Sequence, residues 1–259
     1  WDSHHVYVAN NRRVHRLTRG LEYLDTPVDS LPPNSHQMVA SAGRLYVTCP
    51  WANSLAEIDP TTWAVRYFHL LGDTWHDQPP GDHGDQADVL HVNALLIVGD
   101  RVLVNCHNRH QPSQVLEYAL PEWRRVAQYP MASYTPCKAT HNLAYDGSRL
   151  WTLDTGGTRS LVANDASMVR LNATVSHFAR GLAMTDRHAI VGLSMYGKST
   201  MPNTRDGRLL VIDRQTDERR GFQLHGSGPI MEVRLTDEHD HAHHVPPLRV
   251  QRPGAATVA

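Results

Sequence analysis

The chain has 259 residues, of which 41% are hydrophobic and 20% are charged, and its formal net charge is −1. This balance lacks the basic surface with which proteins hold nucleic acid or anionic lipid, so we expect neither partner. No apolar run approaches the roughly 18 residues of a membrane-spanning helix. The three cysteines do not amount to a disulfide framework, and we therefore expect a cytoplasmic protein.

The chain opens with strand-like segments and then repeats a β unit. Residues 4–24 (HHVYVANNRRVHRLTRGLEYL) read as three short strands, and from residue 36 onward apolar runs of period two alternate with Gly, Asp, Asn and Pro turns. No long amphipathic helix interrupts them. Copies of the unit start at His36, His91, His141, Arg180 and near Gly228, at intervals of 39 to 55 residues. Four-stranded blades of a β-propeller have this period.

The count predicts an all-β fold, a five-bladed β-propeller over residues 1–236. The last blade would combine an innermost strand from the segment near Gly228 with outer strands from the N-terminus, which closes the ring and removes its open edges. A sixth blade in residues 72–90 is the alternative, but the many Pro, Gly and Asp residues there favour a long loop. Residues 237–259 form a His- and Pro-rich tail, predicted to be either solvated or metal-scavenging.

Three of the repeats begin with a histidine. In a propeller, the first strands of successive blades surround the central channel, so His36, His91 and His141 are expected to meet at one mouth. Neutral imidazole is a common ligand of iron, copper and zinc, and three histidines with an open position are typical of a catalytic metal site. A single histidine at a strand start is more often structural, and the metal prediction therefore depends on the recurrence. The predicted cofactor is one transition metal ion, which could be iron(II), copper or zinc.

Further polar residues are predicted on the same face. His107 and His110 follow the second strand of the His91 unit and are candidates for proton transfer or for a further ligand, and Tyr196 follows the second strand of the Arg180 unit. Arg180 replaces a fourth histidine and suits a substrate carboxylate or phosphate, although it could equally cap carbonyl groups. Asp85 and Asp88, just before His91, could form a turn, orient that histidine or ligate the metal, and the turn is the favoured interpretation.

Phrases such as HNLAYDGSRLWTLDT (141–155) and RGLAMTDRHAIVG (180–192) resemble NHL-type and strictosidine-synthase-like propellers. The three blade-start histidines, with Arg180 and Tyr196, are similar in role to the site of metal-bearing propeller lyases. These are the peptidyl-hydroxyglycine amidating lyases and, in scaffold, the virginiamycin-type lyases, both of which have more blades. This resemblance implies a metal-bound active site at the channel mouth.

The sequence thus predicts a metal-dependent enzyme that acts on a small molecule or peptide by oxidative or by lytic or hydrolytic chemistry, with an anionic group of the substrate as the expected partner of Arg180. Nucleophile-elbow, phosphate-loop and dinucleotide-binding motifs are missing from the sequence. The alternative is a non-catalytic propeller that binds a ligand or a protein, because the fold serves both purposes.

Overall fold

The structure is a computed structural model that describes residues 4–79, 88–108, 111–131, 139–165, 167–171, 177–195, 206–235 and 238–243. Its described part consists of β-strands with one short 3₁₀ helix, η1 (Pro50–Ala52). No helix in these ranges has the length and apolar character needed to cross a membrane.

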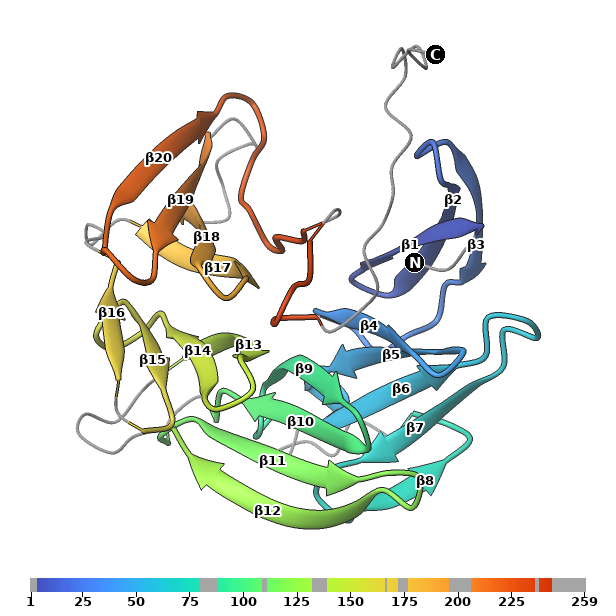
Figure 1. Ribbon diagram of the computed structural model, residues 1–259. Coiled ribbons are helices and arrows are strands. Elements are labelled where there is room, and N and C mark those ends of the chain that lie inside the picture. Colours follow the sequence, from blue (N-terminus) through green and yellow to red (C-terminus); the bar gives the residue numbers. More distant parts are fainter. Residues whose placement is uncertain are drawn as a thin grey trace, which may run out of the picture.

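The strands form five antiparallel sheets arranged around a centre (Figure 1). Blade 1 contains β1 (His5–Asn10), β2 (Arg13–Thr18) and β3 (Tyr23–Val28). Blade 2 contains β4 (Met38–Ser41), β5 (Arg44–Cys49), β6 (Ser54–Ile58), β7 (Val65–His69) and β8 (Thr74–His76). Blade 3 contains β9 (Val92–Val98), β10 (Arg101–Cys106), β11 (Gln114–Ala119) and β12 (Arg124–Pro130). Blade 4 contains β13 (Thr140–Tyr145), β14 (Leu150–Asp154), β15 (Ser160–Ala163) and β16 (Met168–Arg170). Blade 5 contains β17 (His177–Met184), β18 (His188–Met195), β19 (Gly207–Asp213) and β20 (Arg219–Leu224).

The predicted five-bladed propeller is confirmed, and the described residues contain no sixth sheet. The prediction of a loop throughout residues 72–90 is wrong for β8, which pairs with β7. Trp75 explains the difference, because its ring packs against Phe68 and Trp123 with centroid distances of 5.2 Å to each. One aromatic side chain with non-local partners is enough to hold a short strand in a polar sequence.

Consecutive blades are joined by apolar side chains that fill the space between their sheets. One buried cluster joins blades 1 and 2, a second joins blades 2 and 3, a third joins blades 3 and 4, and a fourth joins blades 4 and 5. Cys49 and Cys106 lie within these clusters and are fully buried, as small apolar residues would be. The blades are therefore held in their angular positions by the core, and their first strands β4, β9, β13 and β17 lie nearest the centre (Figure 1).

Blades 5 and 1 meet differently. The predicted closing strand near Gly228 is not formed; residues 227–235 lie between β17 and blades 1 and 2 without joining a sheet (Figure 1). Gly228 has a φ of 69°, and Pro229 has no N–H to donate to a ladder. Side chains pair with this segment instead, as the Ile230 N–H donates to Ser194 Oγ at 2.7 Å. Blade 1 consequently keeps three strands, with β1 at its edge.

The start of the predicted tail is buried, which corrects the expectation of a solvated segment for residues 240–243. Asp240, His241 and His243 are 2%, 9% and 1% exposed. His243 Nδ1 lies 2.7 Å from Asp240 Oδ2, and its Nε2 lies 2.8 Å from Glu232 Oε1. Burial is possible because these polar groups are paired with one another.

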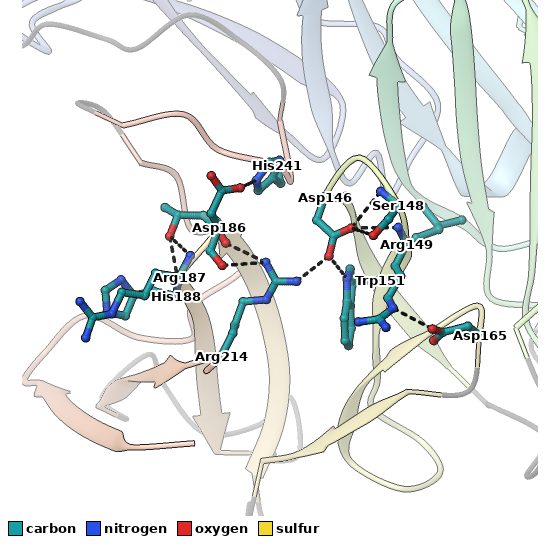
Figure 2. A network of polar contacts seen from close by, with 12 residues as sticks. Asp146, Ser148, Arg149, Trp151, Asp165, Asp186, Arg187, His188, Arg214 and His241 are labelled. Atoms are coloured by element: carbon teal, nitrogen blue, oxygen red, sulfur yellow. Dashed lines mark hydrogen bonds and ion pairs between the residues drawn. The ribbon is translucent and has the colours of Figure 1, made fainter. Parts of the chain in front are cut away.

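Figure 2 shows how this segment contacts the turn between the first two strands of blade 5, and how that turn is linked to blade 4. His241 Nε2 lies 2.7 Å from Asp186 Oδ1 in the turn between β17 and β18. Arg214, after β19, pairs with Asp146 of blade 4, and Trp151 Nε1 donates to the same carboxylate at 2.8 Å. The C-terminal segment is thus attached to a network that already links two blades.

Candidate functional site

The structure brings the three blade-start histidines to the centre of the ring. His36 lies two residues before β4, His91 directly before β9, and His141 within β13. The imidazole ring of His36 lies 5.5 Å from that of His91, measured between centroids. His36 and His141 both line a central cavity of about 40 Å³. His36 and His141 therefore share a cavity, and His91 lies next to His36.

His107 joins them from the loop after β10. Its ring centroid is 4.8 Å from that of His91 and 5.6 Å from that of His141. The four imidazoles form a continuous row, His36–His91–His107–His141, contributed by three consecutive blades. We call this row the histidine cluster. His107 was predicted as a proton-transfer residue or further ligand, and it lies between two of the predicted metal ligands.

Asp88 fixes the orientation of His91. Its Oδ1 lies 2.8 Å from His91 Nδ1, and the carboxylate is buried. At this distance the carboxylate accepts a hydrogen bond from the His91 Nδ1–H, so the proton stays on Nδ1 and the lone pair is on Nε2. Carboxylate–histidine pairs of this type orient histidine ligands in metal sites. The contact supports the orienting role considered for Asp88, and Asp88 also lies in the expected turn, with a φ of 58°, whereas Asp85 lies outside the described residues.

His141 is oriented by the backbone. Its Nδ1 lies 2.8 Å from the Ala139 carbonyl oxygen and 2.9 Å from Thr155 Oγ1. Because a carbonyl oxygen only accepts, Nδ1 carries the proton and Nε2 is an acceptor. Arg180 Nη2 donates to that Nε2 at 3.0 Å. The predicted metal ligand and the predicted anion-binding residue are therefore in direct contact.

Arg180 makes no ion pair with any residue that the structure describes. Its guanidinium lies over the Phe178 ring, 4.6 Å from the centroid, and its Nη1 approaches Met231 Sδ at 3.8 Å. Its Nε is buried without a hydrogen-bond partner. Burial lowers the pKa of Arg180 to about 10, so the side chain is still charged at neutral pH. A desolvated cation without a carboxylate is costly, and an anionic ligand would compensate it.

All four clustered histidines are neutral at physiological pH. Burial lowers the pKa of His36 to about 3, with a further contribution from the Arg180 charge. Burial and the same charge lower the pKa of His91 to about 4. Burial and the neighbouring His91 lower the pKa of His107 to about 4, and burial holds the pKa of His141 well below its ordinary value. Neutral imidazoles keep a lone pair available as ligand or base.

Amide side chains lock the first strands of neighbouring blades together beside the cluster. Gln37 Oε1 accepts from the Leu95 N–H at 2.7 Å, and Asn93 Nδ2 donates to a blade 4 carbonyl at 2.7 Å. Asn142 Oδ1 accepts from the Gly181 N–H at 2.9 Å. Asn142 follows the blade-start histidine in a β-bulge with a φ of 56°, a conformation that asparagine tolerates. These bridges hold the angular positions of the residues around the cavity.

Five residues that line the cavity were not predicted: Gln37, Asn93, Asn142, Met231 and Glu232. Met231 and Glu232, from the C-terminal segment, line the cavity together with His36, His141 and Arg180. The sequence GPIMEVRL was interpreted as a strand, and the one acidic residue in this apolar run was the available signal of a polar surrounding. Of the predicted proton-transfer residues, His110 and Tyr196 lie outside the described residues.

The cluster has the donor chemistry of a metal site but is not arranged as one. No group of three or more His, Cys, Asp or Glu side chains in the described ranges is positioned to hold a metal ion. His36 Nε2 is buried without a hydrogen-bond partner, whereas His141 Nε2 is engaged by Arg180. The three predicted ligands, which include His141, could converge on one ion only after this contact with Arg180 is released.

Comparison with known proteins shows the fold alone. No protein-family model matches the chain, and no curated protein matches it. A chain of the nidogen/laminin complex aligns with a TM-score of 0.58 at 9% identity, covering 85% of this chain and 75% of that one. Hydrazine synthase of Kuenenia stuttgartiensis aligns with a TM-score of 0.51 at 13% identity over 88% of this chain and 65% of that one. A putative TolB from Agrobacterium tumefaciens aligns at 0.47 and 12% identity over 89% and 80%.

The first two neighbours support the propeller fold, and they are a chain from a protein complex and an enzyme. The resemblance to NHL-type and strictosidine-synthase-like propellers is not confirmed by them, nor is the resemblance of the histidines to those of propeller lyases.

Proposed function

We propose that the protein is a metal-dependent enzyme that acts on a small anionic molecule or peptide at the histidine cluster. His36, His91 and His141 would hold one transition metal ion, iron(II), copper or zinc. The observation that supports this best is the row of four neutral imidazoles with centroid separations of 4.8 to 5.6 Å. A structural role for one of them would be ordinary, but four contiguous neutral imidazoles, of which His141 is buried and the other three are partly buried, suit a shared ligand.

Each of the proposed ligands has a feature that favours metal binding. Asp88 holds the His91 proton on Nδ1, so that Nε2 is free of it. The same arrangement at His141 uses the Ala139 carbonyl. The Nε2 atom of His36 is buried without a hydrogen-bond partner, a state that a ligand would relieve.

Arg180 connects substrate binding with the ligand set. A carboxylate or phosphate paired with its guanidinium would replace His141 as its hydrogen-bond partner. The Nε2 lone pair of His141 would then be released toward the cavity. When bound, the metal would activate water or dioxygen or polarise a substrate carbonyl. His107, neutral and adjacent to two of the proposed ligands, is the proposed proton acceptor.

Elemental analysis of protein purified without an affinity tag tests the proposal. We expect about one equivalent of iron, copper or zinc per chain, lost in His91→Ala. His15→Ala in β2 and His239→Ala in the tail are matched controls and should retain the metal. A protein that stays metal-free after exposure to all three ions, or that binds equally well in His91→Ala, would refute the proposed site. Iron or copper would favour oxidative chemistry, and zinc lytic or hydrolytic chemistry.

A non-catalytic ligand-binding propeller is the second candidate, and the Arg180–His141 hydrogen bond favours it. That contact satisfies His141 without a metal and leaves a guanidinium that needs an anion. Anion binding that persists in metal-free protein, with no metal uptake, would establish this function instead.

A further inference from the structure

A groove of about 270 Å³ adjoins the histidine cavity. It lies between β1 of blade 1 and β4 of blade 2, beside the edge where the predicted closing strand is not formed. His36, Gln37 and Glu232 line both the groove and the cavity, so the two spaces share walls. A molecule that lies in the groove would therefore reach the cluster with one end.

The walls of the groove are mainly apolar. Val6, Val8 and Ala9 of β1 form one side, and Met38 and Ala40 of β4 form the other. Val8 is 43% exposed although it belongs to a sheet that packs against blade 2. Apolar surface left open inside a concave site is characteristic of places where ligands bind.

The charged groups at the inner end of the groove already have partners. Glu232 contacts His243 at 2.8 Å and accepts from Gln37 Nε2 at 3.3 Å. Arg234 Nη2 donates to the Met38 carbonyl oxygen at 2.8 Å. Arg180, in the adjoining cavity, makes no ion pair with a carboxylate of the described residues. The combined space thus offers an apolar channel that ends near an uncompensated positive charge.

From this arrangement we infer that groove and cavity together bind an amphiphilic carboxylate, a medium-length unbranched alkanoate, with the carboxylate on Arg180 and the chain between β1 and β4. The inference rests on the proposed function in naming a substrate class for the same site. Its binding part depends on Arg180 and the groove and not on the metal.

Calorimetric binding of butanoate, hexanoate and octanoate to metal-stripped protein tests it, with octan-1-ol as the uncharged probe. Each added methylene that enters the groove should tighten binding about fourfold. Octanoate should bind at least about tenfold more tightly than octan-1-ol, because a desolvated guanidinium favours a carboxylate. Arg180→Met should remove the preference for the carboxylate while keeping the dependence on chain length.

Ala40→Phe fills the groove and should abolish the gain from butanoate to octanoate, whereas Ala119→Phe in β11, far from the groove, should retain it. Affinities that do not depend on chain length, or that are equal for octanoate and octan-1-ol, would overturn the inference. Octanoate binding that appears only after truncation beyond His243 would also overturn it, because the chain's own C-terminal residues would then occupy the groove. All of these results are independent of metal content, so a failed metal site and a failed groove give different outcomes.

Discussion

Acid should destabilise this protein through the histidine cluster, well before its carboxylates titrate. In the unfolded chain the histidines take up protons near their ordinary pKa of 6.5, whereas in the folded protein the pKa of His36 is about 3 and those of His91 and His107 are about 4. Between these values the unfolded state binds more protons, and the free energy of unfolding falls as the pH falls. The stability that the neutral histidines contribute is fully present above pH 6.5 and is lost progressively toward pH 4.

The size of the effect follows from the number of groups. Each histidine contributes up to about 1.4 kcal/mol per pH unit in this window, or about 4 kcal/mol per unit for three. Partial exposure to water screens the cluster, and half of that value, about 2 kcal/mol per pH unit, is a realistic slope. From pH 6.5 to 4.5 the protein should lose about 4 kcal/mol, a large share of the 5 to 15 kcal/mol typical of a folded domain.

Urea unfolding of metal-stripped protein between pH 7 and pH 4.5 measures this slope. A triple variant with glutamine in place of His36, His91 and His107 should show a slope flatter by about 2 kcal/mol per pH unit. His15→Gln, outside the cluster, should leave it unchanged. If the triple variant does not fold, His36→Gln alone should flatten the slope by about a third. Equal slopes in wild type and cluster variants would refute the reasoning.

Three further predictions concern the residues around the cluster. Arg180→Met removes a charge that disfavours protonation of the cluster, so the pKa of His141 should rise in imidazole ¹⁵N NMR titrations; an unchanged value would contradict the assignment. Asp88→Asn should weaken metal binding about 10- to 100-fold by loosening His91, as measured by competition with a chromophoric chelator, with an unaltered affinity arguing against the orienting role. Asn105 Nδ2 in β10 donates to Asn93 Oδ1 and to the Thr140 carbonyl oxygen, and its Oδ1 accepts from Thr140 Oγ1. Asn105→Ala leaves these buried partners unsatisfied and should lower the free energy of unfolding by about 2 to 4 kcal/mol in urea, whereas a loss below about 1 kcal/mol would contradict the stabilising role of these hydrogen bonds.

The blades and the blade-start histidines could be predicted because both follow from a local repeat. A strand–turn–strand unit of near-constant length determines the number of blades, and an equivalent position in each unit determines which residues face the centre. The central positions of His36, His91 and His141 could be predicted from that periodicity alone. The position of His107 between two of them could not, because a repeat does not determine the path of a loop.

The C-terminal part could not be predicted in the same way. The apolar alternation around Gly228 resembles a strand, but the segment is held by side-chain contacts with residues distant in the sequence. Glu232 meets Gln37, 195 positions away, and His243. The contact between Arg180 and His141 is equally non-local, because it depends on the angle between two blades and on the β-bulges within their first strands.

The C-terminal segment is synthesised last, so the central cavity is the last part of the protein to be completed. The ribosome makes the chain from its N-terminus, and a domain generally folds as a unit once its residues are available. Blades 2 to 4, with all four clustered histidines, are made before Met231 and Glu232, which complete the wall of the cavity. A nascent chain would therefore expose the histidines on an open face. We expect selective ligand capture to be a property of the finished molecule, acquired only once residues 227–235 and 238–243 are in place.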